Sequence, residues 1–215
     1  MVREESQIKV TGIFDPVSLN FFLSQGIFHY GFDLRPKSYN FIQEYVLVSL
    51  VEQLQMGSVT LVFENEKDFM IQRVISEVKK VFAGEIFLEF HGLENFDLFD
   101  SFNLPYFFVT KNSLPQSFKR NQVGVVLHQD YFKDILEGNL SLEAHFLEKI
   151  ERQRCNLRFE SALTFPESYT DFISWEMLDL EISQSLCSNY RILDDEKVKK
   201  LLVDMKSFIR KKVKI

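Results

Sequence analysis

The sequence predicts an α/β protein, a single-domain (β/α)8 TIM barrel spanning residues 1–215. Short apolar runs typical of strands alternate along the chain with stretches of helical periodicity, and eight such units can be counted. This alternation indicates a parallel sheet covered by helices, and eight units favour a closed barrel over an open sheet. A length of 215 residues, of which 46% are hydrophobic, is near the lower limit for such a barrel.

The first unit shows the pattern most clearly. Ile8 to Val10 form a short strand-like run, and Asp15 followed by Pro16 is typical of a helix N-terminus. The helix is expected to end at Gly26, and Ile27 to Phe32 form the second strand. Two strands joined by one helix make a βαβ unit, so we expect parallel strands and a right-handed crossover.

The later elements follow the same alternation. Further strands are expected at residues 58–63, 85–90, 106–109, 123–127, 156–159 and 178–182. Helices are expected at residues 43–55, 67–82, 96–102, 141–154 and 166–174, and from Asp194 or Asp195 onward. Residues 111–120 show no clear period and are interpreted as a connection.

Composition excludes several classes of function. The net charge of -6 argues against a nucleic-acid partner, and the basic stretch 210–214 is interpreted as a solvated helix end. Cys155 and Cys187 form no C-x-x-C pattern, so neither a disulfide framework nor a structural zinc site is indicated. We also expect no cofactor and no metal. No apolar run is long enough for a membrane span. We expect a cytoplasmic protein that is a monomer or a homodimer.

Several short motifs occur in a fixed order. They read Lys-Val-Thr-Gly-Ile at 9–13, Gly-Phe-Asp-Leu-Arg-Pro-Lys-Ser-Tyr-Asn-Phe at 31–41, Phe-Glu-Asn-Glu at 63–66, Phe-His-Gly at 90–92, Ser-Ala-Leu-Thr-Phe-Pro-Glu at 161–167 and Glu-Ile-Ser at 181–183. In order and spacing they resemble the motifs of the phosphoribosylanthranilate isomerase family of tryptophan biosynthesis, whose first pattern is K-[IV]-C-G-[IL]. The resemblance extends over essentially the whole chain and implies the same barrel.

The resemblance also implies a reaction, an Amadori rearrangement that needs one acid and one base. The family's base is a cysteine, and its position here is Thr11, whose hydroxyl takes no proton near neutral pH without a strong base beside it. The family's acid is an aspartate after the sixth strand, and His128 occupies that position. Histidine can donate a proton near its ordinary pKa of about 6.5.

The substrate-binding positions that the resemblance implies are changed as well. A carboxylate-binding arginine is matched by Asn40, and His91 falls on a family landmark. Glycine loops that hold the phosphate are matched by Ser161, Ala162 and Leu163 after the seventh strand, and by Ser183, Gln184 and Ser185 after the eighth. A small phosphorylated or anionic ligand is therefore expected at the C-terminal ends of the strands, in a site that departs from the family pattern.

Three interpretations remain open. The chain is a degenerate barrel, weakly active or non-catalytic; or an active isomerase in which His128 shares proton transfer with Glu181 or Asp33; or a different, metal-dependent enzyme. The residues that would ligate such a metal are Glu89, His91, His128, Glu160 and Glu181. Glu89 has a simpler interpretation, in which it points into the barrel and pairs with Lys9 or Arg158. A binding or scaffolding role would require an apolar or charged patch over the strand C-termini.

Overall fold

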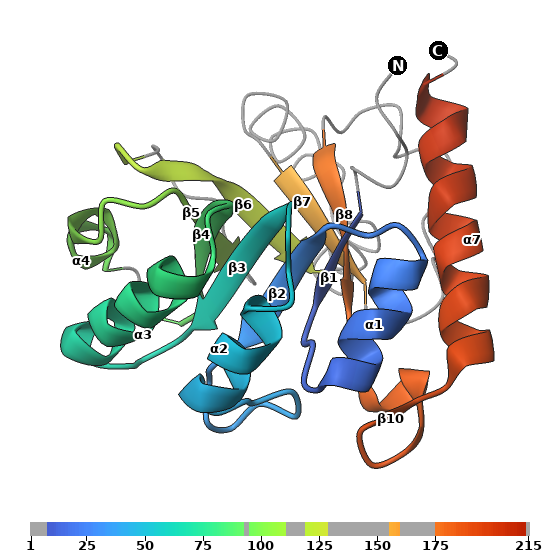
Figure 1. The fold of residues 1–215 in the computed structure, drawn as a ribbon. Coiled ribbons are helices and arrows are strands. Elements are labelled where there is room, and N and C mark those ends of the chain that lie inside the picture. The colour runs from blue at the N-terminus through green and yellow to red at the C-terminus, as the bar shows by residue number, and fades with distance from the viewer. Residues whose placement is uncertain (1–7, 93–94, 111–118, 129–154, 160–174, 214–215) are drawn as a thin grey trace.

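The chain folds into a closed barrel of eight parallel strands, paired in the order of the sequence from β1 to β8 (Figure 1). The computed structural model describes residues 8–92, 95–110, 119–128, 155–159 and 175–213. β1 pairs in parallel with both β2 and β8, which closes the barrel. The predicted (β/α)8 fold is thereby confirmed.

All eight predicted strands are present, with small shifts at their ends. They are β1 Ile8–Thr11, β2 His29–Asp33, β3 Ser58–Phe63, β4 Glu85–Phe90, β5 Tyr106–Thr110, β6 Gln122–His128, β7 Cys155–Phe159 and β8 Trp175–Glu181. β2 begins later than predicted, because the amide of Ile27 donates a hydrogen bond to the carbonyl of Phe22 and so belongs to the turn that follows the preceding helix.

Helices follow the strands along the outside of the barrel (Figure 1). The described ones are α1 Pro16–Ser24, α2 Glu44–Val51, α3 Asp68–Val81, α4 Phe96–Ser101 and α7 Asp195–Val213. The helices predicted at 141–154 and 166–174 lie outside the described residues. A 3-10 turn, η3 Gln184–Leu186, and a hairpin of β9 Cys187–Asn189 and β10 Ile192–Leu193 were not predicted. None of the helices in the described ranges is both long and apolar enough to span a membrane.

The N-terminus of α1 forms as its sequence predicts. The Asp15 carboxylate accepts a hydrogen bond of 2.7 Å from the amide of Ser18, and the Ser18 hydroxyl accepts one from the amide of Asp15. Pro16 occupies the first turn, where its missing N–H costs nothing. This reciprocal capping fixes the point at which the chain leaves β1 and turns back along the barrel.

The strands have an apolar outer face and a largely polar inner face. Outward residues such as Val10, Tyr30 and Leu88 are fully buried against the helices in the main core. Inside, a small apolar cluster is centred on Phe107, Val109 and Val126. The remaining inward side chains near the C-terminal strand ends are mostly charged, whereas barrel interiors are usually filled by branched apolar residues.

Candidate functional site

Four charged side chains meet inside the barrel: Lys9 of β1, Glu89 of β4, Arg158 of β7 and Asp179 of β8. All four are almost completely buried. Lys9 Nζ lies 2.9 Å from Glu89 Oε2 and 3.1 Å from Asp179 Oδ2, while Arg158 Nη2 lies 2.7 Å from Glu89 Oε1 and 2.7 Å from Asp179 Oδ2. We call these four residues the lumen ion cluster. The prediction that Glu89 pairs with Lys9 or Arg158 is confirmed, since it pairs with both.

Glu89 and Arg158 of the lumen ion cluster are stabilised in their charged forms. Burial alone would raise the pKa of the Glu89 carboxyl, but Arg158, Lys9 and His91 outweigh it and hold that pKa well below its usual range. Burial would likewise lower the pKa of Arg158, but Asp179 and Glu89 raise it well above the usual value. Two positive and two negative charges therefore balance in a space without water contact, where a lone charge would be very costly.

Thr11, at the position of the family's base, is tied to this cluster. Its hydroxyl donates a hydrogen bond of 2.7 Å to Asp179 Oδ1, and the side chain is fully buried. A Cβ atom on Gly31 would lie 2.5 Å from the Thr11 hydroxyl, so the glycine on the neighbouring strand is what leaves room for the Thr11 side chain. The structure does place a carboxylate beside Thr11, but that carboxylate is already ion-paired with Lys9 and Arg158.

His91, the family landmark after β4, is held between two charged groups. Its Nδ1 lies 2.8 Å from Arg35 Nη1, and its Nε2 lies 2.9 Å from Glu89 Oε1. Because a guanidinium can only donate, Nδ1 accepts and Nε2–H donates to the carboxylate, which requires a neutral ring. Burial, with the cations Arg35 and Arg158, lowers the pKa of His91 to about 4 despite Glu89. Both ring nitrogens are thus occupied.

Asp33, one of the alternative proton carriers, is also fully engaged. It is completely buried and accepts hydrogen bonds from Arg35 Nε at 2.9 Å, Arg35 Nη2 at 2.6 Å and the Ser38 hydroxyl at 2.5 Å. Arg35 therefore joins Asp33 to His91 across the mouth of the barrel.

Asn40, at the position of the carboxylate clamp, has a structural contact instead. Its Nδ2 donates a hydrogen bond of 2.5 Å to the carbonyl of Ile182, which joins the loop after β2 to the end of β8. Gly12 makes this contact feasible, because a Cβ there would lie 2.3 Å from Asn40 Nδ2 and its φ of +93° disfavours other residues. Among the described residues, Asn40 Oδ1 has no hydrogen-bond partner.

Glu181 is the carboxylate nearest to solvent at the mouth. Its side chain is 15% exposed and lies 3.6 Å from both Arg35 Nη2 and Arg158 Nε. Burial, aided by Asp179 and Glu89, raises its pKa in spite of the two arginines. Of the four carboxylates described at this end of the lumen, Glu181 is the one placed to exchange a proton with a ligand.

The remaining predicted positions are placed only in part. Ser183 caps the turn η3 after β8, and Gln184 and Ser185 begin it, with the two serine hydroxyls 2.7 Å apart. His128 ends β6 in register with Arg158 of β7, and its side chain lies outside the description. Glu160, Ser161, Ala162 and Leu163 also lie outside the described residues. In the described ranges, no three histidine, cysteine or acidic side chains gather as a metal-binding group.

This architecture can be compared with known proteins. Phosphoribosyl anthranilate isomerase from Thermus thermophilus matches with a TM-score of 0.68 at 16% identity, covering 94% of this chain and 98% of that one. TrpF from Jonesia denitrificans matches with a TM-score of 0.68 at 14% identity, covering 96% and 97%. The chain has the fold of the phosphoribosylanthranilate isomerases. No protein-family profile and no curated protein matches the sequence.

Two further isomerase structures bear on ligand and assembly. One is a complex with reduced 1-(o-carboxyphenylamino)-1-deoxyribulose 5-phosphate, and it matches with a TM-score of 0.56 at 17% identity over 100% of both chains. The other contains monomers generated from the dimeric isomerase of Thermotoga maritima, and it matches with a TM-score of 0.64 at 17% identity, covering 96% and 99%.

Sequence reasoning missed two parts of this site. Asp179 was placed in a strand but was given no role, although charged residues at 179 and 181 in an otherwise apolar strand put two carboxylates on its inner face. The bridge from Asp33 through Arg35 to His91 had no sequence signal, because it joins two loops that are far apart in the chain.

Proposed function

We propose that this chain is a divergent phosphoribosylanthranilate-isomerase-like barrel that has lost most or all of the family's Amadori rearrangement. One observation carries the proposal: the polar side chains at the positions of the family's catalytic and substrate-binding residues are hydrogen-bonded to other groups of the protein. Thr11 is bonded to Asp179, Asn40 to Ile182, and His91 to Arg35 and Glu89.

The rearrangement requires a group that removes a proton from carbon. Thr11 has no such capacity, because its hydroxyl proton is directed at Asp179 and that carboxylate is neutralised by Lys9 and Arg158. Absence of a positioned base typically lowers a rate by about 10²- to 10⁴-fold. Asn40 adds a binding defect, since an amide cannot form the bidentate charged pair that an arginine makes with a carboxylate.

A small phosphorylated or anionic ligand at the barrel mouth remains part of the proposal. Arg35 supports it, since it is a partly exposed cation at the strand C-terminal ends. Its contacts with Asp33 and His91 weaken the attraction it can offer an anion. A cytoplasmic location stays a prediction from the sequence.

The test is the isomerase reaction itself. The purified chain is incubated with phosphoribosylanthranilate, conversion is followed by chromatography, and the Thermus thermophilus isomerase serves as the positive control. In parallel, the gene is expressed in a tryptophan auxotroph that lacks the isomerase, with an immunoblot to establish that folded protein accumulates. We expect no growth and no conversion above background. Growth without tryptophan would refute the proposal.

The second candidate is an active, divergent isomerase, and Glu181 is the observation that favours it. Its raised pKa and its partly exposed place at the mouth suit a proton donor, in a role that the sequence also assigns to His128. If the auxotroph does grow, Glu181→Gln should abolish growth without lowering the amount of protein. Asp33→Asn would not discriminate, because Asp33 holds Arg35 in place.

A further inference from the structure

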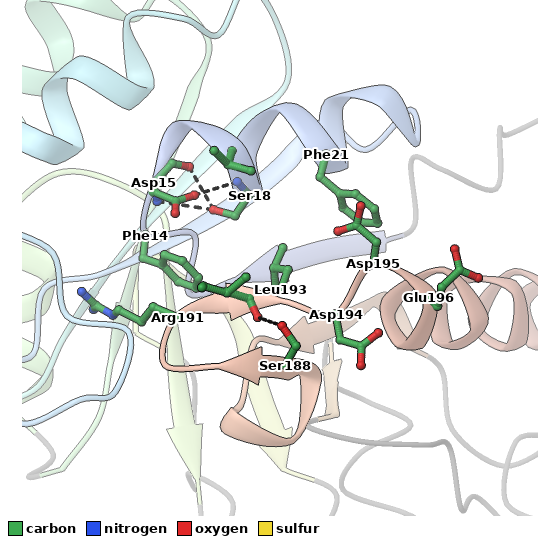
Figure 2. A pocket seen from close by; sticks show the side chains of 12 residues that line it. Phe14, Asp15, Ser18, Phe21, Ser188, Arg191, Leu193, Asp194, Asp195 and Glu196 are labelled. Atoms are coloured by element: carbon green, nitrogen blue, oxygen red, sulfur yellow. Dashed lines mark hydrogen bonds between the residues drawn. The ribbon is translucent and has the colours of Figure 1, made fainter.

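A second feature lies on the outer rim of the barrel, away from the lumen. A cavity of about 570 Å³ opens between the start of α1, the β9–β10 hairpin and the start of α7 (Figure 2). We call it the rim pocket. Phe14, Phe21 and Leu193 contribute apolar wall, and Val17 and Ile192 stand at its edge with 77% and 57% of their surface exposed. Exposed apolar side chains gathered at a cavity indicate a surface that binds something.

The rim pocket is acidic. It is lined by the carboxylates of Asp15, Asp194, Asp195 and Glu196. The amide and ammonium groups of Lys197 hold the pKa of Asp194 below its usual value, so that side chain is charged at neutral pH. Lys197 and Lys199 pair with Asp194 and Glu196 at 3.1 and 3.4 Å, but exposed pairs of this kind screen the charge only partly.

The cation in the pocket wall, Arg191, is already committed. Its Nε donates to the carbonyl of Tyr39 at 3.1 Å, its Nη2 donates to the carbonyl of Phe41, and its guanidinium lies 5.4 Å from the ring centre of Phe14. The two helix N-termini at the pocket are likewise capped by Asp15 and Asp194. An anion would therefore be repelled, and an occupant must be cationic with an apolar portion.

One stretch of this chain combines positive charge with apolar side chains. Residues 210–215 read Arg-Lys-Lys-Val-Lys-Ile, with four basic and no acidic residues and two apolar ones. Residues 1–7 carry one basic and two acidic residues, residues 129–154 carry four and six, and residues 160–174 carry none and three. Residues 111–118 carry a single lysine. Charge complementarity thus singles out residues 210–215.

The same molecule cannot supply this stretch to its own pocket. The pocket lies at the start of α7 and the basic stretch at its end, and α7 has 19 residues (Figure 1). At a rise of about 1.5 Å per residue the two are separated by roughly 28 Å. Residues 210–213 belong to that helix, so in the same molecule they cannot reach the pocket at its start, and the occupant must come from another molecule.

We propose that residues 210–215 of a second copy of this chain dock in the rim pocket, with their lysines toward Asp195 and Glu196 and an apolar side chain between Val17 and Ile192. The contact joins two different surfaces, so it is heterologous and leaves one free pocket and one free basic end on every pair. Association then continues to longer strings or closes into a ring.

The first test is sedimentation velocity of the full chain at increasing protein concentration. At about 0.01 M salt, where the Debye length is about 30 Å, the mass should rise with concentration; at about 1 M salt, where it is about 3 Å, the chain should be monomeric. A chain that stays monomeric at low salt, or a mass that does not respond to salt, would overturn the proposal.

Two variants then separate the two halves of the contact. The pocket variant carries Ile192→Ser, Asp195→Asn and Glu196→Gln, and the end variant carries Lys211→Glu and Lys212→Glu. Each alone should associate at least about tenfold more weakly than the parent chain, since attraction between unlike charges is removed. Mixed in equal amounts they should form a 1:1 dimer and nothing larger, because one intact pocket and one intact basic end remain. Failure of the mixture to pair would indicate an interface between identical surfaces and refute the proposal.

The matched control is Lys79→Glu with Lys80→Glu, which reverses the same number of lysines in the last turn of α3. It should leave self-association unchanged, and an equal loss would show a general charge effect. A measurement without any variant guards against misfolding: a synthetic peptide Lys-Ser-Phe-Ile-Arg-Lys-Lys-Val-Lys-Ile, residues 206–215, should dissociate the parent chain's assemblies. No effect of this peptide at a large molar excess would count against the docking.

Discussion

Replacement of Arg158 by methionine should be among the most damaging single changes in this protein. Arg158 Nη2 lies 2.7 Å from both Glu89 and Asp179, and the three side chains are at most 1% exposed. Methionine fills a similar volume but leaves two buried carboxylates with only Lys9 to balance them. A buried pair broken in this way typically loses about 3–5 kcal/mol, which is a large part of the roughly 5–15 kcal/mol that stabilises a domain.

The measurement is urea unfolding at neutral pH, followed by circular dichroism. Arg73→Met is the matched control, because Arg73 pairs with Glu44 at 2.5 Å but is 60% exposed, and such a pair contributes less than about 1 kcal/mol. The double variant Arg158→Met with Asp179→Asn restores one positive and one negative charge, Lys9 and Glu89. The stability that the double variant loses should be smaller than the sum of the losses in Arg158→Met alone and Asp179→Asn alone, since the effects of substitutions at residues in contact are not additive. An Arg158→Met variant no less stable than Arg73→Met would refute this account of the lumen ion cluster.

Three further predictions follow from the described contacts. The free energy of unfolding should fall as the pH falls from 6.5 to about 4, because His91 takes up a proton in the unfolded chain but stays neutral in the folded one. The slope is at most about 1.4 kcal/mol per pH unit. Urea midpoints of His91→Gln should not show this pH dependence, and a variant that still shows it would contradict the reasoning. Thr11→Cys should stay inactive in the isomerase assay, because one thiol beside a neutralised Asp179 does not supply substrate binding, and activity above that of Thr11→Ala would contradict this. Asp15→Ala should lower the free energy of unfolding by about 0.5–2 kcal/mol through loss of the α1 cap, and an unchanged thermal midpoint would show that the cap contributes nothing.

The barrel could be predicted from the sequence because local signals repeat along it. Asp15 and Pro16 mark the start of α1, Gly26 follows its end, and Ser58–Phe63 is a short run of mostly apolar residues that is buried on both faces, as a parallel strand should be. Each signal depends on neighbours in the chain, so one sequence suffices to place it. The β9–β10 hairpin escaped prediction because its strands have only three and two residues, and because its turn uses Arg191 with a positive φ of 53° rather than glycine.

The site could be predicted only as a set of positions. Thr11 and Asn40 were correctly placed near the strand C-termini, but their partners are 168 and 142 residues away along the chain. Period-two alternation predicts that Glu89 faces inward and needs a cation, which proved correct. The alternation does not predict that Asp179 accepts a hydrogen bond from the Thr11 hydroxyl or that Arg35 bridges Asp33 and His91. These contacts depend on how far the side chains reach across the closed barrel.

These contacts also bear on how tightly the mouth could hold an anion. To bind a substrate carboxylate or phosphate, the Arg35 guanidinium would have to leave Asp33, and Asp33 would then be a fully buried charge with only the Ser38 hydroxyl and the Arg35 amide as hydrogen-bond donors. A loss of this kind costs several kcal/mol, and every 1.4 kcal/mol spent on rearrangement weakens binding about tenfold. An anion bound by Arg35 without displacing Asp33 would have to lie outside the barrel, above the 15% of Arg35 that reaches solvent. Weak, salt-sensitive anion binding that Arg35→Met removes, with Asp33 still buried, is therefore the behaviour this mouth should show.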